Sequence, residues 1–197
     1  MKRALVIVDI QNDYFPGGKM ELVGMKEAAN NAKHVLELCR AKNAPIFHIQ
    51  HLSNGAGATF FLPETDGVEI HGSVAPQGDE YIIQKNFPNS FRDTSLTEQL
   101  KRIDVDEVIF CGAMTHMCID TSVRAAFDLG FRCLVVSDAC ATKDLEYGGV
   151  LVDAAQVHTA YMAALSSVFA HVLMVNELET QLVNLSSSGE THKSRAS

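Results

Sequence analysis

The chain has 197 residues, of which 47% are hydrophobic and 20% are charged, and it carries a formal net charge of −8. A chain of this length can form one domain that buries roughly 70% of its unfolded surface. The excess of 24 acidic over 16 basic residues argues against nucleic acid as a partner, which requires a clustered basic face, and against an anionic membrane surface.

The amino terminus and the cysteines favour a cytoplasmic location. No apolar run approaches the roughly 20 residues that span a bilayer, and Asp9 interrupts the first run too early for a signal peptide. The cysteines are odd in number and form no CxxC pair, which is typical of a reducing compartment rather than a disulfide framework. They are Cys39, Cys111, Cys118, Cys133 and Cys140.

Short apolar runs alternate with helical patterns along the chain. The expected strands cover residues 4–8, 45–50, 81–84, 108–111, 133–136 and 172–175, and the expected helices cover 26–42, 95–102, 117–129 and 149–169. Because the runs are apolar throughout, they are typical of parallel strands that helices cover on both faces. Their alternation with helices predicts a doubly wound α/β sheet.

We expect residues 1–183 to form a single domain. The glycine-rich segment 52–80 is long for a connection within a compact domain, so it is expected to be functional or poorly ordered. The Ser-rich segment 184–197 shows no apolar period and is expected to be a mobile polar tail.

Three reactive side chains follow strands of the predicted sheet. Asp9 closes the first strand, Lys85 closes the third, and Cys118 opens the helix after the fourth. Ligands bind off the carboxyl ends of parallel strands, so these side chains are candidates for one site, although each alone has an ordinary structural explanation. A helix N-terminus and an ammonium both stabilise a thiolate, which predicts a lowered pKa for Cys118. An adjacent carboxylate can take and return the thiol proton.

Among the other cysteines, Cys140 is the one expected to be accessible, in a turn after the fifth strand.

The motifs that bind common cofactors are missing from the sequence. The turn after the first strand reads IQNDYFPGG rather than the GxGxxG of dinucleotide-binding proteins, and the chain contains neither a GxxxxGKS/T loop nor a GxSxG elbow. We therefore expect no cofactor and no serine nucleophile.

Three ordered blocks resemble the isochorismatase-like cysteine hydrolases, the superfamily that includes nicotinamidases and other small-amide amidohydrolases. The blocks are DIQNDY at 9–14 with Gly17-Gly18, Lys85 followed by Ser90-Phe91, and GAMTHMC at 112–118, and Asp138-Ala139 and His158 also fit. The resemblance covers nearly the whole chain. It implies a three-layer fold with six parallel strands in the order 3-2-1-4-5-6, which places the ends of strands one and four side by side.

The resemblance also implies a catalytic triad of Asp9, Lys85 and Cys118. Asp9 would act as general base toward the Cys118 thiol, Lys85 would keep Asp9 ionised, and the sulfur would attack an amide carbonyl to form a thioester. The backbone N–H groups of Met114 and Cys118 would receive the oxyanion. Family members have a cis peptide bond at this point, which falls here between Ala113 and Met114.

The expected substrate is a small amide or ureido compound in a largely apolar pocket. The candidate aromatic walls and polar contacts of this pocket are Tyr14, Phe60, Phe61, Phe87, His51 and His116. Two alternatives stay open. One is vinyl-ether hydrolysis of an isochorismate-like substrate, which the presence of Cys118 disfavours. The other is a non-catalytic or redox-sensing member of the same fold, with Cys111 as the nearest candidate for a resolving cysteine.

No metal is expected, although nicotinamidases bind one through an Asp-x-His pattern after strand two. Here that region reads HIQHL at 48–52, without the Asp. His51 and His71 could in principle join Asp66 or Glu69 in a metal site, but we favour a buried His48 and polar loop positions for the other two histidines. The expected partners are a small-molecule substrate and further copies of the chain, in a dimer or tetramer.

Overall fold

A six-stranded parallel sheet forms the centre of the computed structural model, which describes residues 1–190 and the side chains of residues 1–182. Its strand order is β3-β2-β1-β4-β5-β8. The strands are β1 (Arg3–Val8), β2 (Ile46–His51), β3 (Tyr81–Lys85), β4 (Glu107–Ala113), β5 (Arg132–Ala141) and β8 (His171–Leu173). The predicted doubly wound α/β fold and its strand order are therefore confirmed, with β8 as the sixth strand of the sheet.

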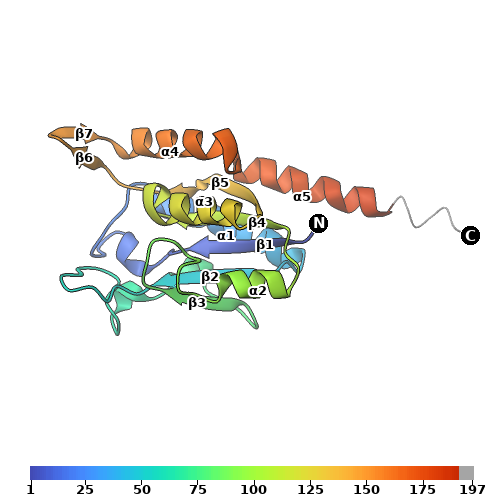
Figure 1. Ribbon diagram of the computed structural model, residues 1–197, viewed down its shortest axis with the longest axis horizontal. Helices are drawn as coiled ribbons and strands as arrows, with labels where there is room; N and C mark the ends of the chain where they lie inside the picture. The colour runs from blue at the N-terminus through green and yellow to red at the C-terminus, as the bar shows by residue number, and fades with distance from the viewer. Residues whose placement is uncertain (191–197) are drawn as a thin grey trace, which may run out of the picture.

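Helices cover both faces of this sheet, which explains why the strands are apolar throughout (Figure 1). The helices α1 (Met25–Ala41) and α5 (Val175–Glu190) pack on one face, and α2 (Leu96–Arg102), α3 (Asp120–Asp128) and α4 (Ala154–Val168) pack on the other. In β1, Leu5 and Ile7 contribute to the core under α1, whereas Val6 and Val8 contribute to the core under α3. None of the helices among residues 1–190 combines the length and apolarity needed to cross a bilayer.

Several element boundaries differ from the sequence-based expectation. A hairpin of β6 (Leu145–Tyr147) and β7 (Val150–Val152) occupies the region where helix was expected from residue 149. Gly148 and Gly149 have φ values of +59° and +79°, which suits a two-residue turn and stops a helix from starting there. The helix α4 begins only at Ala154, after the side chain of Asp153 caps the backbone N–H of Gln156.

The structure also differs from the sequence-based expectation at one helix, at one strand and near the expected end of the domain. The expected helix 117–129 is split into a π-helical turn (Thr115–Ile119) and α3, and the expected strand 172–175 ends earlier because Val175 already starts α5. The helix α5 continues to Glu190, beyond the domain boundary expected at residue 183. Residues 191–197 of the expected tail lie outside the described residues.

The first part of the segment 52–80, up to His71, lies at the carboxyl ends of the strands and is tied to the turn after β1 (Figure 1). The Asp13 carboxylate accepts the backbone N–H of Phe61 at 2.7 Å and that of Lys19 at 3.0 Å. Gln11 donates to the carbonyl of Val68 at 2.7 Å and to that of His51 at 2.9 Å. These buried polar contacts hold the segment as part of the site rather than as a loose loop.

A glycine allows β4 to approach β1 directly below Asp9. Gly112 is the register partner of Val8 and has a φ of +123°, a conformation that L side chains rarely adopt. A Cβ atom at this position would lie 2.0 Å from the Val8 carbonyl oxygen. The end of β4 can therefore pair with the end of β1, next to Asp9, only because residue 112 has no side chain.

We predict that Gly112→Ala lowers the free energy of unfolding by about 3 kcal/mol, because the backbones of β1 and β4 must separate. Urea denaturation measures this. Gly72→Ala is the matched control, since no atom lies within 4 Å of the added Cβ there. Equal stability of the two variants would show that the close approach at Gly112 is not required.

Candidate active site

The ends of β1, β3 and β4 bring Asp9, Lys85 and Cys118 together. Lys85 Nζ lies 2.7 Å from Asp9 Oδ2. One polar atom each of Asp9, His51 and Cys118 lies within 4.8 Å of the others. The three residues expected to form a triad therefore share one site, and His51 of β2 lies beside them.

The backbone turns sharply at Asp9, where φ is +52°. Its N–H still donates to the carbonyl of Ile49 at 3.1 Å, so the residue continues the pairing of β1 with β2 before the chain leaves the sheet. Asp tolerates this left-handed conformation better than most residues. The side chain is fully buried at the sheet edge, facing the end of β4.

Lys85 is a buried cation, and its partners stabilise the charged form. Its side chain has no solvent exposure, and Nζ contacts the carboxylate of Asp9, the carbonyls of Phe87 and Pro88 at 3.1 and 3.2 Å, and Nδ1 of His51 at 3.1 Å. Burial lowers the pKa of Lys85, but the interactions with Asp9 and Cys118 outweigh burial, and the pKa is raised overall. The ammonium form is therefore stable inside the protein.

The Cys118 thiol is protonated at neutral pH, contrary to the expectation from the sequence. Burial raises its pKa to about 12, and Asp9 adds to this effect, while Lys85 opposes it without compensating. The predicted lowering of the Cys118 pKa is therefore wrong. The residue is only 4% exposed, and desolvation acts against the thiolate. Attack by the sulfur of a protonated thiol requires a proton acceptor, and a carboxylate oxygen of Asp9 lies within 4.8 Å of the sulfur.

The other cysteines are buried thiols away from this cluster. Burial raises the pKa of Cys39, Cys133 and Cys140 to about 12 and raises that of Cys111 well above its usual value. Cys140 was expected in an accessible turn, but β5 continues to Ala141 and buries it. The sequence did not show this because the apolar run ends at Val136.

The residues expected to bind the oxyanion belong to one compact turn. The peptide bond between Ala113 and Met114 is cis. The carbonyl of Met114 accepts the backbone N–H of Met117 at 3.0 Å and that of Ile119 at 3.2 Å, which ties the end of β4 to the π-helical turn. Met114 and Cys118 therefore lie at opposite ends of the same short segment.

Tyr14 and His51 line the site beside the triad. Tyr14 is 1% exposed, and burial, followed by electrostatic interactions with Cys118 and Asp9, raises its pKa well above the usual value. Its ring lies 4.6 Å from that of Phe61 and 6.0 Å from that of Phe60, between centroids. Burial lowers the pKa of His51, which favours a neutral imidazole next to the Lys85 ammonium.

The side chains of the other two candidates for substrate binding have partners of their own. The Phe87 ring is covered by the Arg92 guanidinium, 3.5 Å from the ring centroid. Nδ1 of His116 lies 2.6 Å from the hydroxyl of Thr142, and its ring packs against the edge of Tyr161. Of the four candidates for substrate binding, Tyr14 and His51 therefore interact directly with the cluster of Asp9, Lys85 and Cys118.

Gln11 is a residue of the site to which the sequence analysis gave no role. Its Oε1 accepts the backbone N–H of His51 at 2.8 Å, and its Nε2 donates to the carbonyl of the same residue at 2.9 Å. The amide thus fixes the end of β2 next to Asp9. The available signal was a glutamine three residues after the first strand; it is fully buried, and such a side chain must find partners.

The cluster of Asp9, His51 and Cys118 has metal-ligand types but does not fit a cation. The Lys85 ammonium lies 2.7 Å from the carboxylate and 3.1 Å from the imidazole, so its charge already occupies the centre of the group. The alternative ligand His71 is engaged elsewhere: its ring stacks on Phe15 at 3.6 Å, and Nδ1 lies 2.8 Å from Ser73 Oγ.

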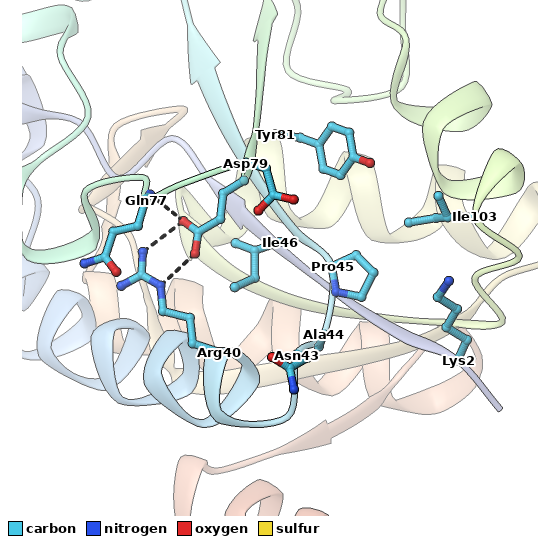
Figure 2. Close-up of a pocket in the computed structure, with 11 residues that line it drawn as sticks. Lys2, Arg40, Asn43, Ala44, Pro45, Ile46, Gln77, Asp79, Tyr81 and Ile103 are labelled. Atoms are coloured by element: carbon cyan, nitrogen blue, oxygen red, sulfur yellow. Dashed lines mark hydrogen bonds and ion pairs between the residues drawn. The ribbon is translucent and has the colours of Figure 1, made fainter.

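A cavity of about 400 Å³ lies at the opposite edge of the sheet, at the amino ends of β2 and β3 (Figure 2). Its central carboxylate, Glu80, accepts hydrogen bonds from Arg40, from the backbone of Gln77 and from His48. Burial alone would raise the pKa of Glu80, but these donors lower it to about 2. The charges are mutually satisfied, which indicates a structural network rather than reacting groups.

We predict that Lys85→Met lowers the free energy of unfolding by about 3–5 kcal/mol, because it leaves the Asp9 carboxylate buried without its cation. Lys33→Met is the control: Lys33 forms an exposed pair with Glu37 at 3.8 Å, and its loss is expected to change stability by about 0.5 kcal/mol or less. Similar small losses in both variants would contradict a buried ion pair.

We predict that Asp9→Asn accelerates alkylation of Cys118 by iodoacetamide at pH 7 while it removes turnover. The Asp9 charge raises the pKa of Cys118, so its removal leaves Lys85 to stabilise the thiolate and increases the reactive fraction. Mass spectrometry of the labelled peptide from pH 6 to 10 measures this. Asp120→Asn, on α3, is the control and should leave the profile unchanged. Slower labelling of Asp9→Asn would contradict this electrostatic account.

Comparison with known proteins places this site in a family. The sequence matches the family model described as "Isochorismatase domain" over residues 3–177. The isochorismatase family protein YddQ of Bacillus subtilis is 50% identical over 172 residues, covering 87% of this chain and 96% of that protein. Nicotinamidase 3 of Arabidopsis thaliana is 29% identical over 192 residues, covering 91% of this chain and 88% of the relative.

The fold comparison agrees with the sequence comparison. The crystal structure of a proposed isochorismatase hydrolase from Oleispira antarctica superposes with a TM-score of 0.88 at 46% identity, covering 91% of this chain and 96% of that one. Together with the family match over residues 3–177, this agreement shows that the chain belongs to the isochorismatase family.

Proposed function

We propose that the protein is a cysteine hydrolase that cleaves a small amide or ureido substrate through a thioester on Cys118. The observation that carries this proposal is a protonated, buried thiol whose sulfur lies within 4.8 Å of a carboxylate oxygen, and this carboxylate is paired at 2.7 Å with a buried ammonium. This arrangement supplies a nucleophile, a base and a fixed counter-charge in one place.

In the first half of the reaction, the proton of Cys118 moves to Asp9 as the sulfur attacks the carbonyl carbon. The oxyanion of the tetrahedral intermediate accepts hydrogen bonds from the backbone N–H groups of Met114 and Cys118, each typically worth a few kcal/mol. The intermediate collapses as the C–N bond breaks, and Asp9 returns its proton to the leaving nitrogen. Ammonia or an amine departs, and the acyl group remains on the sulfur.

In the second half, water attacks the thioester carbonyl while Asp9 accepts a proton from it. The C–S bond then breaks, the sulfur recovers a proton, and a carboxylic acid leaves. Lys85 keeps its proton throughout, because its raised pKa makes it a stable counter-charge rather than an acid. Its role is to hold Asp9 ionised and to orient the carboxylate.

The walls of the site support a small, uncharged substrate with a flat apolar part. Tyr14 and Phe61 lie next to the triad with their rings 4.6 Å apart, and Phe60 extends the aromatic surface. Neutral His51 supplies a nearby polar group. A nicotinamidase among the relatives supports an amide as the substrate class.

Two alternative functions are less well supported. Vinyl-ether hydrolysis needs an acid but no nucleophile, so it gives no role to Cys118 next to Asp9 and Lys85. A redox sensor needs a resolving cysteine near Cys118, but Cys111 lies in the core on the other face of the sheet and interacts with Cys140 and Cys39.

The expected dimer or tetramer stays a prediction. Exposed apolar side chains gather on the β6–β7 hairpin, where Tyr147, Val150 and Leu151 are 90%, 64% and 67% exposed. Side chains of this kind are often covered in subunit contacts.

We predict ammonia release from at least one member of a panel of small primary amides and ureido compounds. Cys118→Ala is expected to lower turnover by about 1,000-fold or more, since the nucleophile is lost, whereas Cys39→Ala, in α1, should retain it. A coupled assay for ammonia measures both variants. Full activity of Cys118→Ala, or cleavage of vinyl ethers but of no amide, would overturn the proposal.

A further inference from the structure

A buried hydrogen-bond chain connects α4 to the turn that carries the nucleophile. Thr115 opens the π-helical turn and is fully buried. Its Oγ1 lies 3.2 Å from the carbonyl oxygen of Ala141 in β5 and 3.0 Å from Nδ1 of His158 in α4. The mechanism above assigns no role to either Thr115 or His158.

The chemistry of the three groups fixes the direction of this chain. A carbonyl oxygen can only accept, so the single hydroxyl proton of Thr115 goes to Ala141. The contact with His158 must then be a bond in which Nδ1–H donates to the Thr115 oxygen. The imidazole is therefore protonated on Nδ1, and in its neutral form the other ring nitrogen carries no proton.

One side of the His158 ring faces a cavity. His158 lines a cavity of about 210 Å³ together with Thr142 and Ala154. Among the side-chain hydrogen bonds of the described residues, the bond to Thr115 is the one that orients this ring. In turn, that bond and the one to Ala141 hold Thr115 from two elements, α4 and β5, at the start of the turn.

We propose that His158 is a positioning residue, which through Thr115 holds Met114 and Cys118 in the geometry that receives the oxyanion. This inference rests on the proposed function, because it assigns the oxyanion to the backbone of this turn. Thr115 directly follows Met114, so a rotation at Thr115 moves both the Met114 N–H and the segment that leads to Cys118. Small displacements of catalytic groups reduce the rate strongly.

The test uses two substitutions that remove the bond and two that retain it. His158→Leu removes the donor and Thr115→Val removes the acceptor. His158→Asn places an N–H₂ group about where Nδ1 was, and Thr115→Ser keeps the hydroxyl. We expect the first pair to lower kcat by about 10- to 100-fold with KM essentially unchanged, since the loss concerns the transition state. The second pair should recover most of the activity.

Thr159→Val is the matched control on α4, because Thr159 is exposed. Thermal unfolding of all variants separates loss of fold from loss of position. The double variant His158→Leu/Thr115→Val should be no slower than the slower single variant, since the two residues act through one bond. Additive losses would overturn the proposal, as would failure of His158→Asn to restore kcat or parallel changes in kcat and KM.

A second readout needs no turnover. In ¹⁵N-histidine-labelled protein near neutral pH, the His158 resonance should show the proton on Nδ1, and Thr115→Val should change that signal. A proton on Nε2 alone would overturn the assignment.

If the wild-type protein hydrolyses no amide, the proposed function fails. The position of the turn is then judged by iodoacetamide labelling of Cys118, whose rate should change in His158→Leu and return in His158→Asn. An unchanged rate in His158→Leu would overturn the positioning role.

Discussion

The buried ion pair between Asp9 and Lys85 is the interaction on which the rest of the site depends. Removing two charges from water costs several kcal/mol per ion, and the cost is offset only when the geometry is good and the remaining donors are satisfied. Here the two charged atoms lie 2.7 Å apart, and the ammonium also meets the carbonyls of Phe87 and Pro88. The neighbouring structure serves this pair: Gly112 lets β4 reach it, and Gln11 fixes the strand beside it.

The same pair explains how, in the proposed mechanism, a buried thiol reacts without first becoming a thiolate. With Lys85 positive and Asp9 negative, the resting site has no net charge, and burial keeps Cys118 protonated. In the proposed mechanism, the proton moves to Asp9 during attack and the negative charge moves to the oxyanion, so the net charge of the site stays at zero. A site that is poorly solvated favours such a redistribution over the creation of an isolated charge. The raised pKa of Cys118 is thus compatible with catalysis.

The sequence contained enough information for the fold and for the triad, but not for their energetics. Continuous apolar runs such as 4–8 identify buried parallel strands, and the blocks around Asp9, Lys85 and Cys118 identify the family. The sequence did not show that burial raises the pKa of Cys118. The two features that it did show, a helix N-terminus and a lysine, both lower a thiol pKa. The β6–β7 hairpin was missed although Gly148-Gly149 between two apolar triplets is a hairpin signal, because the Ala-rich helix pattern after it extended over the same residues. The contact of Thr115 with His158 joins residues 43 positions apart, which no local pattern predicts.

The most direct test of the account is detection of the acyl-enzyme. Rapid acid quench of the protein during turnover of a cleavable amide, followed by proteolysis and mass spectrometry, measures which side chain carries the acyl group. The account predicts the mass of the acyl fragment on the peptide that contains Cys118, at a level that falls when substrate is exhausted and that hydroxylamine removes. An acyl group on another residue, or steady turnover with Cys118 unmodified under conditions in which hydrolysis of the thioester is slow, would contradict it.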